Sequence, residues 1–463
     1  MLTNCQINSN IHTNDCTIST RDGAIYILVL NMKHRCFIAL FAVLAFMPLA
    51  MLRSVSCHAA SVATGHPVDN FRKSAVIKAF KGYMKEKNYT KAKTEIDNAV
   101  AKYEEASRDA QLYRYKLDAL NELIGAENNK IYLKSNPDTT SFFNYIYELY
   151  VTGLKCDSME QRYVMSRHAE HKKAEPKLRR GVGQTMLPYR RNLLNAGKFY
   201  YNKRDYANAF KFIDMYAQTK SAEVFDDSKG ISIVDDPDDV VSISVLAVLS
   251  AYGSDNYLGV KSYLQESLRE TDLVPQLLEI GSKSCAELGD TTGMVDLLTK
   301  GFDGYPEIEY FFMTLTKYYN DNSMYDKALS IASRMCELYP QNRDYWFLEG
   351  KEYLLTDNYD KALISFEKCV EIKADDAEAF SAIGNIYLHD AHEAYSKFNV
   401  SLSDPSYSRK KTSINDFYVK ACAAFEQAKT FDEANKELWL SGLRESYFKL
   451  NKGRKLKELE KYK

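Results

Sequence analysis

Residues 343–387 read RDYWFLEGKEYLLTDNYDKALISFEKCVEIKADDAEAFSAIGNIY, and this stretch decides the fold. Aromatic and small side chains occur in a fixed order within it, and the order starts again 34 residues further on. The residues that share this register are Trp346, Gly350, Tyr353, Ala362 and Phe366, and then Phe380, Gly384 and Tyr387. A fixed period of this length indicates helical hairpins that stack and bury their apolar faces against one another.

The same order continues on both sides of this stretch. It occurs 34 residues earlier at Phe312, Thr316, Tyr319 and Ala328, and units are expected to start near positions 241, 275, 309, 343 and 377. The unit at 377 is interrupted, because its second helical pattern begins only at about Asp416. We therefore expect a C-terminal array over residues 241–463 with an inserted loop at about 391–415, the place where repeats tolerate extra sequence.

The upstream chain divides into segments that follow the repeat and segments that do not. A helical period of 3.6 residues predicts helix pairs within 61–126 and one further unit at 190–224. Residues 127–189 are expected to form an irregular helical segment, because their pattern departs from the repeat. Residues 225–240 are rich in aspartate and are interpreted as an acidic linker.

On these residues the chain resembles the tetratricopeptide repeat (TPR) proteins, of an exported bacterial type. It departs from the family pattern at Glu349, where the family usually has leucine, and at Cys369, where it prefers alanine. The resemblance implies an all-α fold, a right-handed α-solenoid of stacked antiparallel helix pairs. It also implies a concave face that binds a peptide or a protein partner.

The N-terminal region has the pattern of an export signal. A basic head at Met32 to Arg35 precedes an apolar run over residues 36–52 and small residues up to Ala60, so residues 32–60 are interpreted as a signal peptide. Residues 1–31 are then an upstream extension, with Met32 as the initiator. A retained membrane anchor at 36–52 and lipidation at Cys57 are the alternatives. The protein is expected to be exported, to a periplasmic or envelope location.

Composition narrows the classes of function further. The formal net charge is −1 over 463 residues, which gives no reason to expect nucleic acid as a partner. None of the nine cysteines forms a CxxC pair, so zinc ribbons are not indicated and buried free thiols are expected. No cofactor is expected.

Signatures of catalysis are also lacking. His168 and His171 flank Glu170, but the zinc-protease pattern HExxH does not occur. Gly181-Val-Gly183 is not followed by the lysine and hydroxyl residue of a phosphate-binding loop. The sequence therefore favours a non-catalytic protein.

One set of residues is a candidate binding site. With Gly350 as the eighth position of its unit, the ninth position of successive units holds Lys283, Lys317, Lys351, Asn385 and Arg444. In the resembled family this position faces the concave groove, so these donors would form a ladder for carboxylates or an acidic peptide. The alternative is that they are ordinary solvated residues on exposed helix faces.

The sequence therefore predicts an exported, non-catalytic scaffold that binds a protein or peptide partner in the groove of a solenoid. One alternative is a membrane-anchored component that organises an envelope assembly. The other is a ligand-binding or enzymatic role for the irregular region 127–189.

Overall fold

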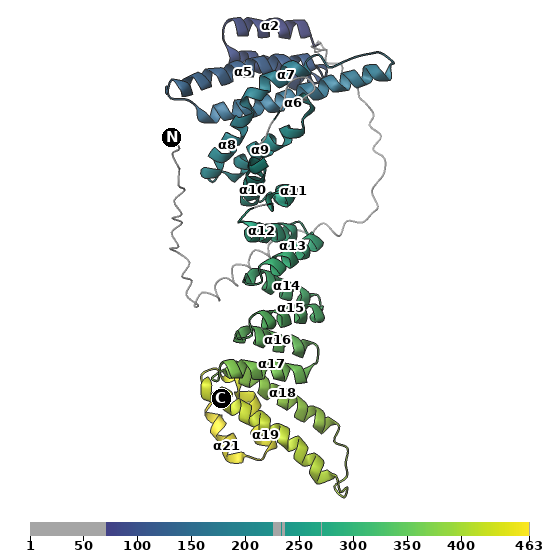
Figure 1. Cartoon of the computed structure of the whole chain (residues 1–463), viewed down its shortest axis with the longest axis vertical. Coiled ribbons are helices and arrows are strands. Elements are labelled where there is room, and N and C mark those ends of the chain that lie inside the picture. Colours follow the sequence, from purple (N-terminus) through teal and green to yellow (C-terminus); the bar gives the residue numbers. More distant parts are fainter. Residues whose placement is uncertain (1–70, 226–232, 234–236, 270, 463) are drawn as a thin grey trace, which may run out of the picture. The chain divides into compact units, whose positions relative to one another are not determined.

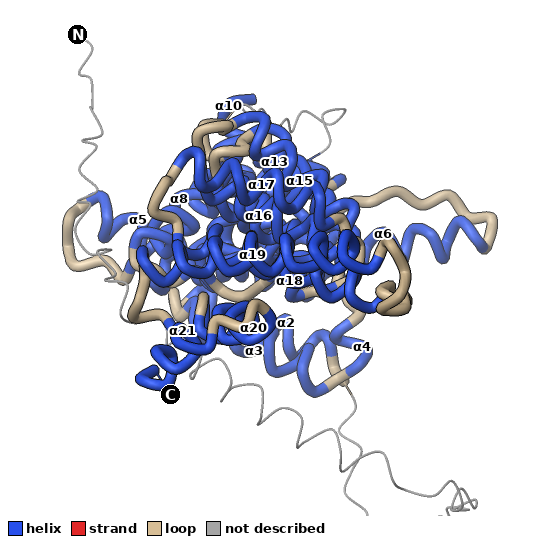
Figure 2. The backbone as a smooth tube through the Cα atoms, turned by 90° about the horizontal axis from the view of Figure 1, so that it is seen from below, coloured by secondary structure: helices blue, strands red, loops and turns tan. Residues whose placement is uncertain are grey.

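The computed structural model describes residues 71–225, 233, 237–269 and 271–462. Within these ranges the chain consists of helices and their connections, and no strand occurs in them (Figure 2). The upstream extension at 1–31, the signal peptide at 32–60 and most of the acidic linker lie outside the described residues. Of the helices in the described ranges, none has the length and apolarity needed to cross a membrane.

The first part of the described chain runs from Phe71 to Phe225 and includes its longest helix. Its helices are α2 (Lys73–Lys85), α3 (Tyr89–Lys102), α4 (Glu104–Ser107), α5 (Ala110–Tyr132), α6 (Thr139–Ala169), α7 (Arg179–Met186), α8 (Arg190–Asn202) and α9 (Tyr206–Gln218). Short 3-10 turns lie at Leu187–Tyr189, Thr219–Ser221 and Glu223–Phe225. The region predicted to be irregular contains α6, with 31 residues, and the short α7.

The second part is a series of helices, most of them 17 residues long or shorter (Figure 1). These helices are α10 (Pro237–Gly253), α11 (Tyr257–Ser267), α12 (Val274–Glu287), α13 (Thr291–Gly304), α14 (Glu309–Asp321), α15 (Tyr325–Leu338), α16 (Arg343–Leu355), α17 (Tyr359–Ile372), α18 (Ala377–Ser396), α19 (Tyr407–Phe431), α20 (Leu440–Lys449) and α21 (Gly453–Glu458). Each packs mainly against the helix before it and the helix after it. Helices paired in this way form an α-solenoid, which is the expected fold class.

The turn between the two helices of a pair repeats with the same period as the sequence. Asp255, Gly289, Ser323 and Asp357 all have positive φ, between 55° and 70°, and follow one another at intervals of 34 residues. In three of these turns the next residue is an asparagine or aspartate that caps the second helix, as Asp290 does for α13. The left-handed residue ends one helix and the cap starts the other, so the turn fixes the register of each pair.

The signature residues of the repeat are packing residues. A Cβ atom placed on Gly350 would come within 2.7 Å of the Phe366 ring, and one on Gly384 within 2.8 Å of Phe425. Both rings are almost fully buried, as is Ala362. Glycine at this position therefore lets the aromatic residue of the second helix approach the backbone of the first.

The inserted residues at 391–415 lengthen two helices instead of forming a long loop. Helix α18 continues to Ser396 and α19 begins at Tyr407, so only residues 397–406 connect them. Ala391 and Ile414 are buried in this extension. The insertion is helical because both added segments carry apolar residues that cover each other.

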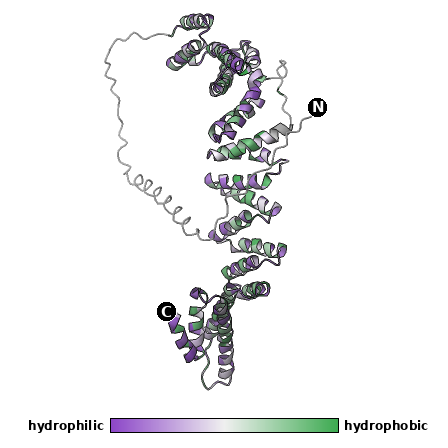
Figure 3. Cartoon of the chain, turned by 90° about the vertical axis from the view of Figure 1, so that its left-hand side faces the viewer, coloured by the Kyte–Doolittle hydropathy of each residue, from purple (hydrophilic) through white to green (hydrophobic). Residues whose placement is uncertain are grey.

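Many of the helices are amphipathic, and the described cysteines lie on their buried faces. Figure 3 shows polar and apolar residues on the same helices, as expected where one face is covered by neighbours. The thiols of Cys156, Cys285, Cys336, Cys369 and Cys422 are free and buried, as expected. Burial raises the pKa of the Cys156 thiol to about 12, and raises the others as well.

Candidate partner-binding site

The first helices of two successive pairs, α14 and α16, border a pocket of about 460 Å³. It is lined by Met313, Thr316, Lys317 and Asn320 of α14 and by Leu348, Lys351, Glu352, Leu354 and Leu355 of α16. Met313 and Leu355 are each 47% exposed, although both are large apolar side chains. Exposed apolar residues grouped beside a pocket are typical of surfaces that bind a partner.

Buried polar side chains form part of the lining of this pocket. Glu352 is 2% exposed and Thr316 is 4% exposed. The Asn320 side-chain amide donates a hydrogen bond of 2.9 Å to Glu352 Oε1. Among the described residues, Glu352 Oε2, Asn320 Oδ1 and Thr316 Oγ1 have no hydrogen-bond partner. We call these three side chains the polar floor of the pocket.

The electrostatics of the polar floor follow from this geometry. Burial raises the pKa of Glu352 above its usual range, while the hydrogen bond from Asn320 and the charge of Lys351 act in the opposite direction. A buried carboxylate is normally paired with a cation or surrounded by donors. In the described part of the chain Glu352 has only the one donor from Asn320, so its second oxygen is buried without a donor.

A second pocket, of about 530 Å³, continues the first along the same two helices. The two share Met313, Leu348 and Lys351, so they form one groove. Its ionic lining consists of Glu307, Glu309, Asp344 and Glu352 against Lys317, Arg343 and Lys351.

Most of the positive charge in this groove is already paired. The Arg343 guanidinium binds Asp376 and lies 2.8 Å from Glu378. Lys317 Nζ lies 2.6 Å from Asp321 Oδ2. Carboxylates therefore dominate the charge that remains available in the groove.

The structure brings only two of the five predicted donors together. Lys317 and Lys351 line the same pocket. Lys283 on α12 is paired with Glu279 at 2.5 Å and lies over the ring of Tyr310. Asn385 is exposed on α18, while Arg444 of α20 lines a separate pocket of about 620 Å³.

The sequence pattern did not single out the polar floor. Thr316 occupies a repeat position, and no motif in the sequence connects it with Asn320 or Glu352. Glu352 occupies a position of α16 between the repeat residues Gly350 and Tyr353. Lys351 is ionisable and lies between the same two residues, so the sequence alone does not distinguish Glu352 or show its partners.

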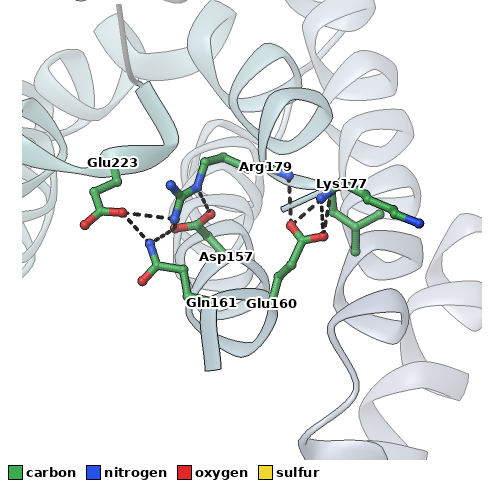
Figure 4. Close-up of polar contacts among 7 residues, drawn as sticks. Asp157, Glu160, Gln161, Lys177, Arg179 and Glu223 are labelled. Carbon is green, nitrogen blue, oxygen red and sulfur yellow. Dashed lines mark hydrogen bonds and ion pairs between the residues drawn. The ribbon is translucent and has the colours of Figure 1, made fainter. Parts of the chain in front are cut away.

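The long helix α6 carries a second group of buried carboxylates (Figure 4). Glu160 accepts hydrogen bonds of 2.6–3.1 Å from the backbone N–H groups of Lys177, Leu178 and Arg179. Asp157 binds the Arg179 guanidinium through both of its oxygens. Burial raises the pKa of Asp157, with Arg179 opposing the rise.

This second group holds the start of α7 against α6. Its carboxylates are fully occupied, and Gln161 and Glu223 complete the network at its outer side (Figure 4). A pocket of about 570 Å³ lies beside Glu160, but the oxygens of that residue face the backbone of α7. In this arrangement Asp157 and Glu160 bind groups of the chain itself and hold two helices of region 127–189 together.

The described residues contain no cluster of histidine, cysteine or acidic side chains suited to a metal ion. His168 Nε2 lies 2.8 Å from the carbonyl of Ala174, and His171 follows the end of α6 with a positive φ of 57°. The two histidines therefore belong to the end of a helix.

Helix pairs that repeat at 34 residues define the class as an α-solenoid built like tetratricopeptide repeats. Among solved structures the chain is similar to TPR-repeat proteins. A TPR repeat protein from Bacteroides fragilis is 14% identical, with a TM-score of 0.28, over 56% of this chain and 97% of that one. The C-terminal part of a TPR protein from Cytophaga hutchinsonii is 14% identical, with a TM-score of 0.30, over 54% and 99%.

Two more comparisons concern particular proteins. The MamA protein is 12% identical, with a TM-score of 0.31, over 41% of this chain and 90% of that one. The formate-dependent nitrite reductase complex subunit NrfG of Escherichia coli O157:H7 is 24% identical over 89 residues. That match covers 19% of this chain and 45% of the relative, so this chain spans less than half of the length of NrfG. No family model matches the chain.

Proposed function

We propose that this protein is a non-catalytic scaffold that holds a peptide or protein partner in the groove between α14 and α16. The observation that carries the proposal is the pocket itself, which combines exposed Met313 and Leu355 with the polar floor. Apolar anchors surrounded by a few specific polar groups are the usual composition of a recognition site. A solenoid presents such surfaces because each helix pair contacts only its neighbours.

The ladder residues take different parts in this proposal. Lys317 and Lys351 contact partner carboxylates at the edge of the pocket, whereas Lys283, Asn385 and Arg444 extend the contact along the first helices of the array. Export to the periplasm or the envelope belongs to the proposal as well, and the signal pattern at residues 32–60 supports it. A membrane-anchored form of the same scaffold would use residues 36–52 or Cys57.

Site-specific photo-crosslinking tests the docking face. A benzoylphenylalanine in place of Met313 should crosslink to a partner in the envelope fraction, because that side chain lines the pocket and is 47% exposed. The matched control is the same replacement at Ile364, which is 57% exposed on the second helix of its pair, α17. The double variant K317E/K351E should reduce the crosslink from position 313. Equal crosslinking from both positions would contradict the proposed face.

A further inference from the structure

We propose that the pocket between α14 and α16 accepts a lysine side chain from an extended peptide segment of the partner, with its ammonium group bound by the polar floor. The inference deepens the proposed function and rests on it. It names a basic residue, whereas the ladder at the rim of the groove suggests acidic ones.

The first step is that the polar floor lacks hydrogen-bond donors for its buried acceptor atoms. Glu352 Oε2 and Asn320 Oδ1 can only accept hydrogen bonds, and the Thr316 hydroxyl can accept as well as donate. Among the described residues all three atoms are buried and without a partner. An ammonium group has three donors and no acceptor, so it matches three acceptors without adding an unsatisfied atom. A partner carboxylate would face Glu352 with the same charge.

The second step is charge. Glu352 has no ion-pair partner among the described residues, and burial raises its pKa, as expected for a carboxylate without a counter-charge. The adjoining part of the groove adds Glu307 and Glu309, both exposed. Lys317 is paired with Asp321, which leaves Lys351 as the opposing charge. An incoming cation would therefore gain a charge-assisted hydrogen bond inside the pocket and a favourable field outside it.

The third step is shape. The pocket volume of about 460 Å³ lies within the range of sites that take small ligands or side chains. Met313, Leu348, Leu354 and Leu355 give it apolar walls beside the polar floor, and Lys317 and Lys351 also line it. A lysine side chain has four methylene groups that can lie against such walls while its charged end reaches the carboxylate. The pocket thus offers apolar surface for the methylene groups and hydrogen-bond acceptors for the ammonium group.

The test uses three synthetic nonapeptides with blocked ends that differ only at the central residue, which is lysine, norleucine or glutamate. Leucines flank this residue to contact Met313 and Leu355. Binding to the full chain is measured by fluorescence polarisation at low salt. The lysine peptide should bind at least tenfold more tightly than the norleucine peptide, and the glutamate peptide should bind most weakly.

Two variants assign the preference to the polar floor. E352Q removes the buried charge and should reduce the preference for lysine over norleucine to less than twofold. E337Q is the matched control, because it makes the same change at an exposed glutamate of α15 that lines neither part of the groove. It should leave the preference within twofold of the unmodified protein. Circular dichroism confirms that both variants fold.

The outcomes separate this inference from the docking face. Equal binding of the lysine and norleucine peptides overturns the lysine pocket and leaves the docking face in place. Tightest binding of the glutamate peptide overturns it in favour of the ladder of Lys317 and Lys351. Binding of none of the three overturns both this inference and the proposed docking face, provided that the Met313 crosslink is also absent. Retention of the preference in E352Q overturns the assigned role of Glu352.

Discussion

Glu160 on α6 and Glu352 on α16 are both buried glutamates beside a pocket, and yet the two regions use them differently. Glu160 is 7% exposed and receives backbone donors from the start of α7 on both oxygens. Glu352 is 2% exposed and receives one side-chain donor on one oxygen. Burial and a nearby pocket therefore do not identify a binding residue. The feature that distinguishes Glu352 is its acceptor without a donor, which is costly to bury and supports the role proposed for it.

The largest expected effect is on stability and comes from the substitution of Glu160, the glutamate with a structural role. E160Q should destabilise the contact of α6 with α7 by about 2–3 kcal/mol, because a charged acceptor is lost and the new amide places donors against backbone N–H groups. Native-state hydrogen exchange of the α7 amides measures this locally, which suits a repeat protein without a single unfolding transition. E170Q, at the exposed position that follows the last residue of the same helix, is the control and should change protection by about 0.5 kcal/mol or less. Similar effects of E160Q and E170Q would show that Glu160 does not have the structural role assigned to it.

The next effect should have the opposite sign. E352Q should stabilise the α14–α16 region by about 1 kcal/mol at neutral pH, because it replaces a buried charge with a neutral amide that can also donate. The control is E349Q, one helical turn earlier, where Ser333 and Ser365 donate to both carboxylate oxygens at 2.7 and 2.8 Å. That variant should destabilise the same region. If E352Q were as destabilising as E349Q, Glu352 would be a structural residue.

The pH dependence of the E352Q effect sharpens the same contrast. Because the pKa of Glu352 is raised in the folded state, the folded protein retains this proton to higher pH than the unfolded chain. The unmodified protein should match E352Q in stability below the ordinary glutamate value of about 4.3. It should fall behind E352Q as the pH rises from there through the higher folded value. Hydrogen exchange of the α16 amides at pH 4 and pH 7 measures the difference, and a pH-independent difference would contradict an ionised Glu352.

The smallest expected effect separates a gain in stability from a loss of binding. Ser323 has a φ of 57°, which glycine adopts at no steric cost. S323G should therefore stabilise the α14–α15 turn by about 0.5 kcal/mol, measured by native-state hydrogen exchange of the α15 amides, and leave binding of the lysine peptide unchanged. Ser323 does not line the pocket. If S323G also weakened binding of the lysine peptide, the gain in stability, and not the lost charge, could explain the binding defect of E352Q.

The sequence predicted the architecture better than the site. The helix pairing could be predicted because the same packing contact recurs in each unit. A recurring contact leaves a recurring sequence pattern, here at Gly350, Ala362 and Phe366. Glu349, which departs from the family pattern, is accommodated by Ser333 and Ser365 from different helices. The lack of a donor for Glu352 Oε2 could not be predicted, because it depends on where the neighbouring helices place their side chains. The ladder of Lys283, Lys317, Lys351, Asn385 and Arg444 remains a prediction.

The buried cysteines impose an order of events on a chain that enters an oxidising compartment. Thiols react as thiolates, so the high pKa values and burial of the folded state protect them, whereas the unfolded chain exposes them to oxidation and wrong pairing. Folding would then compete with oxidation during translocation. Helix pairs that contact mainly their neighbours favour rapid folding, since few distant segments must meet. If the chain is exported as proposed, the modular architecture would in this way protect its thiols from oxidation.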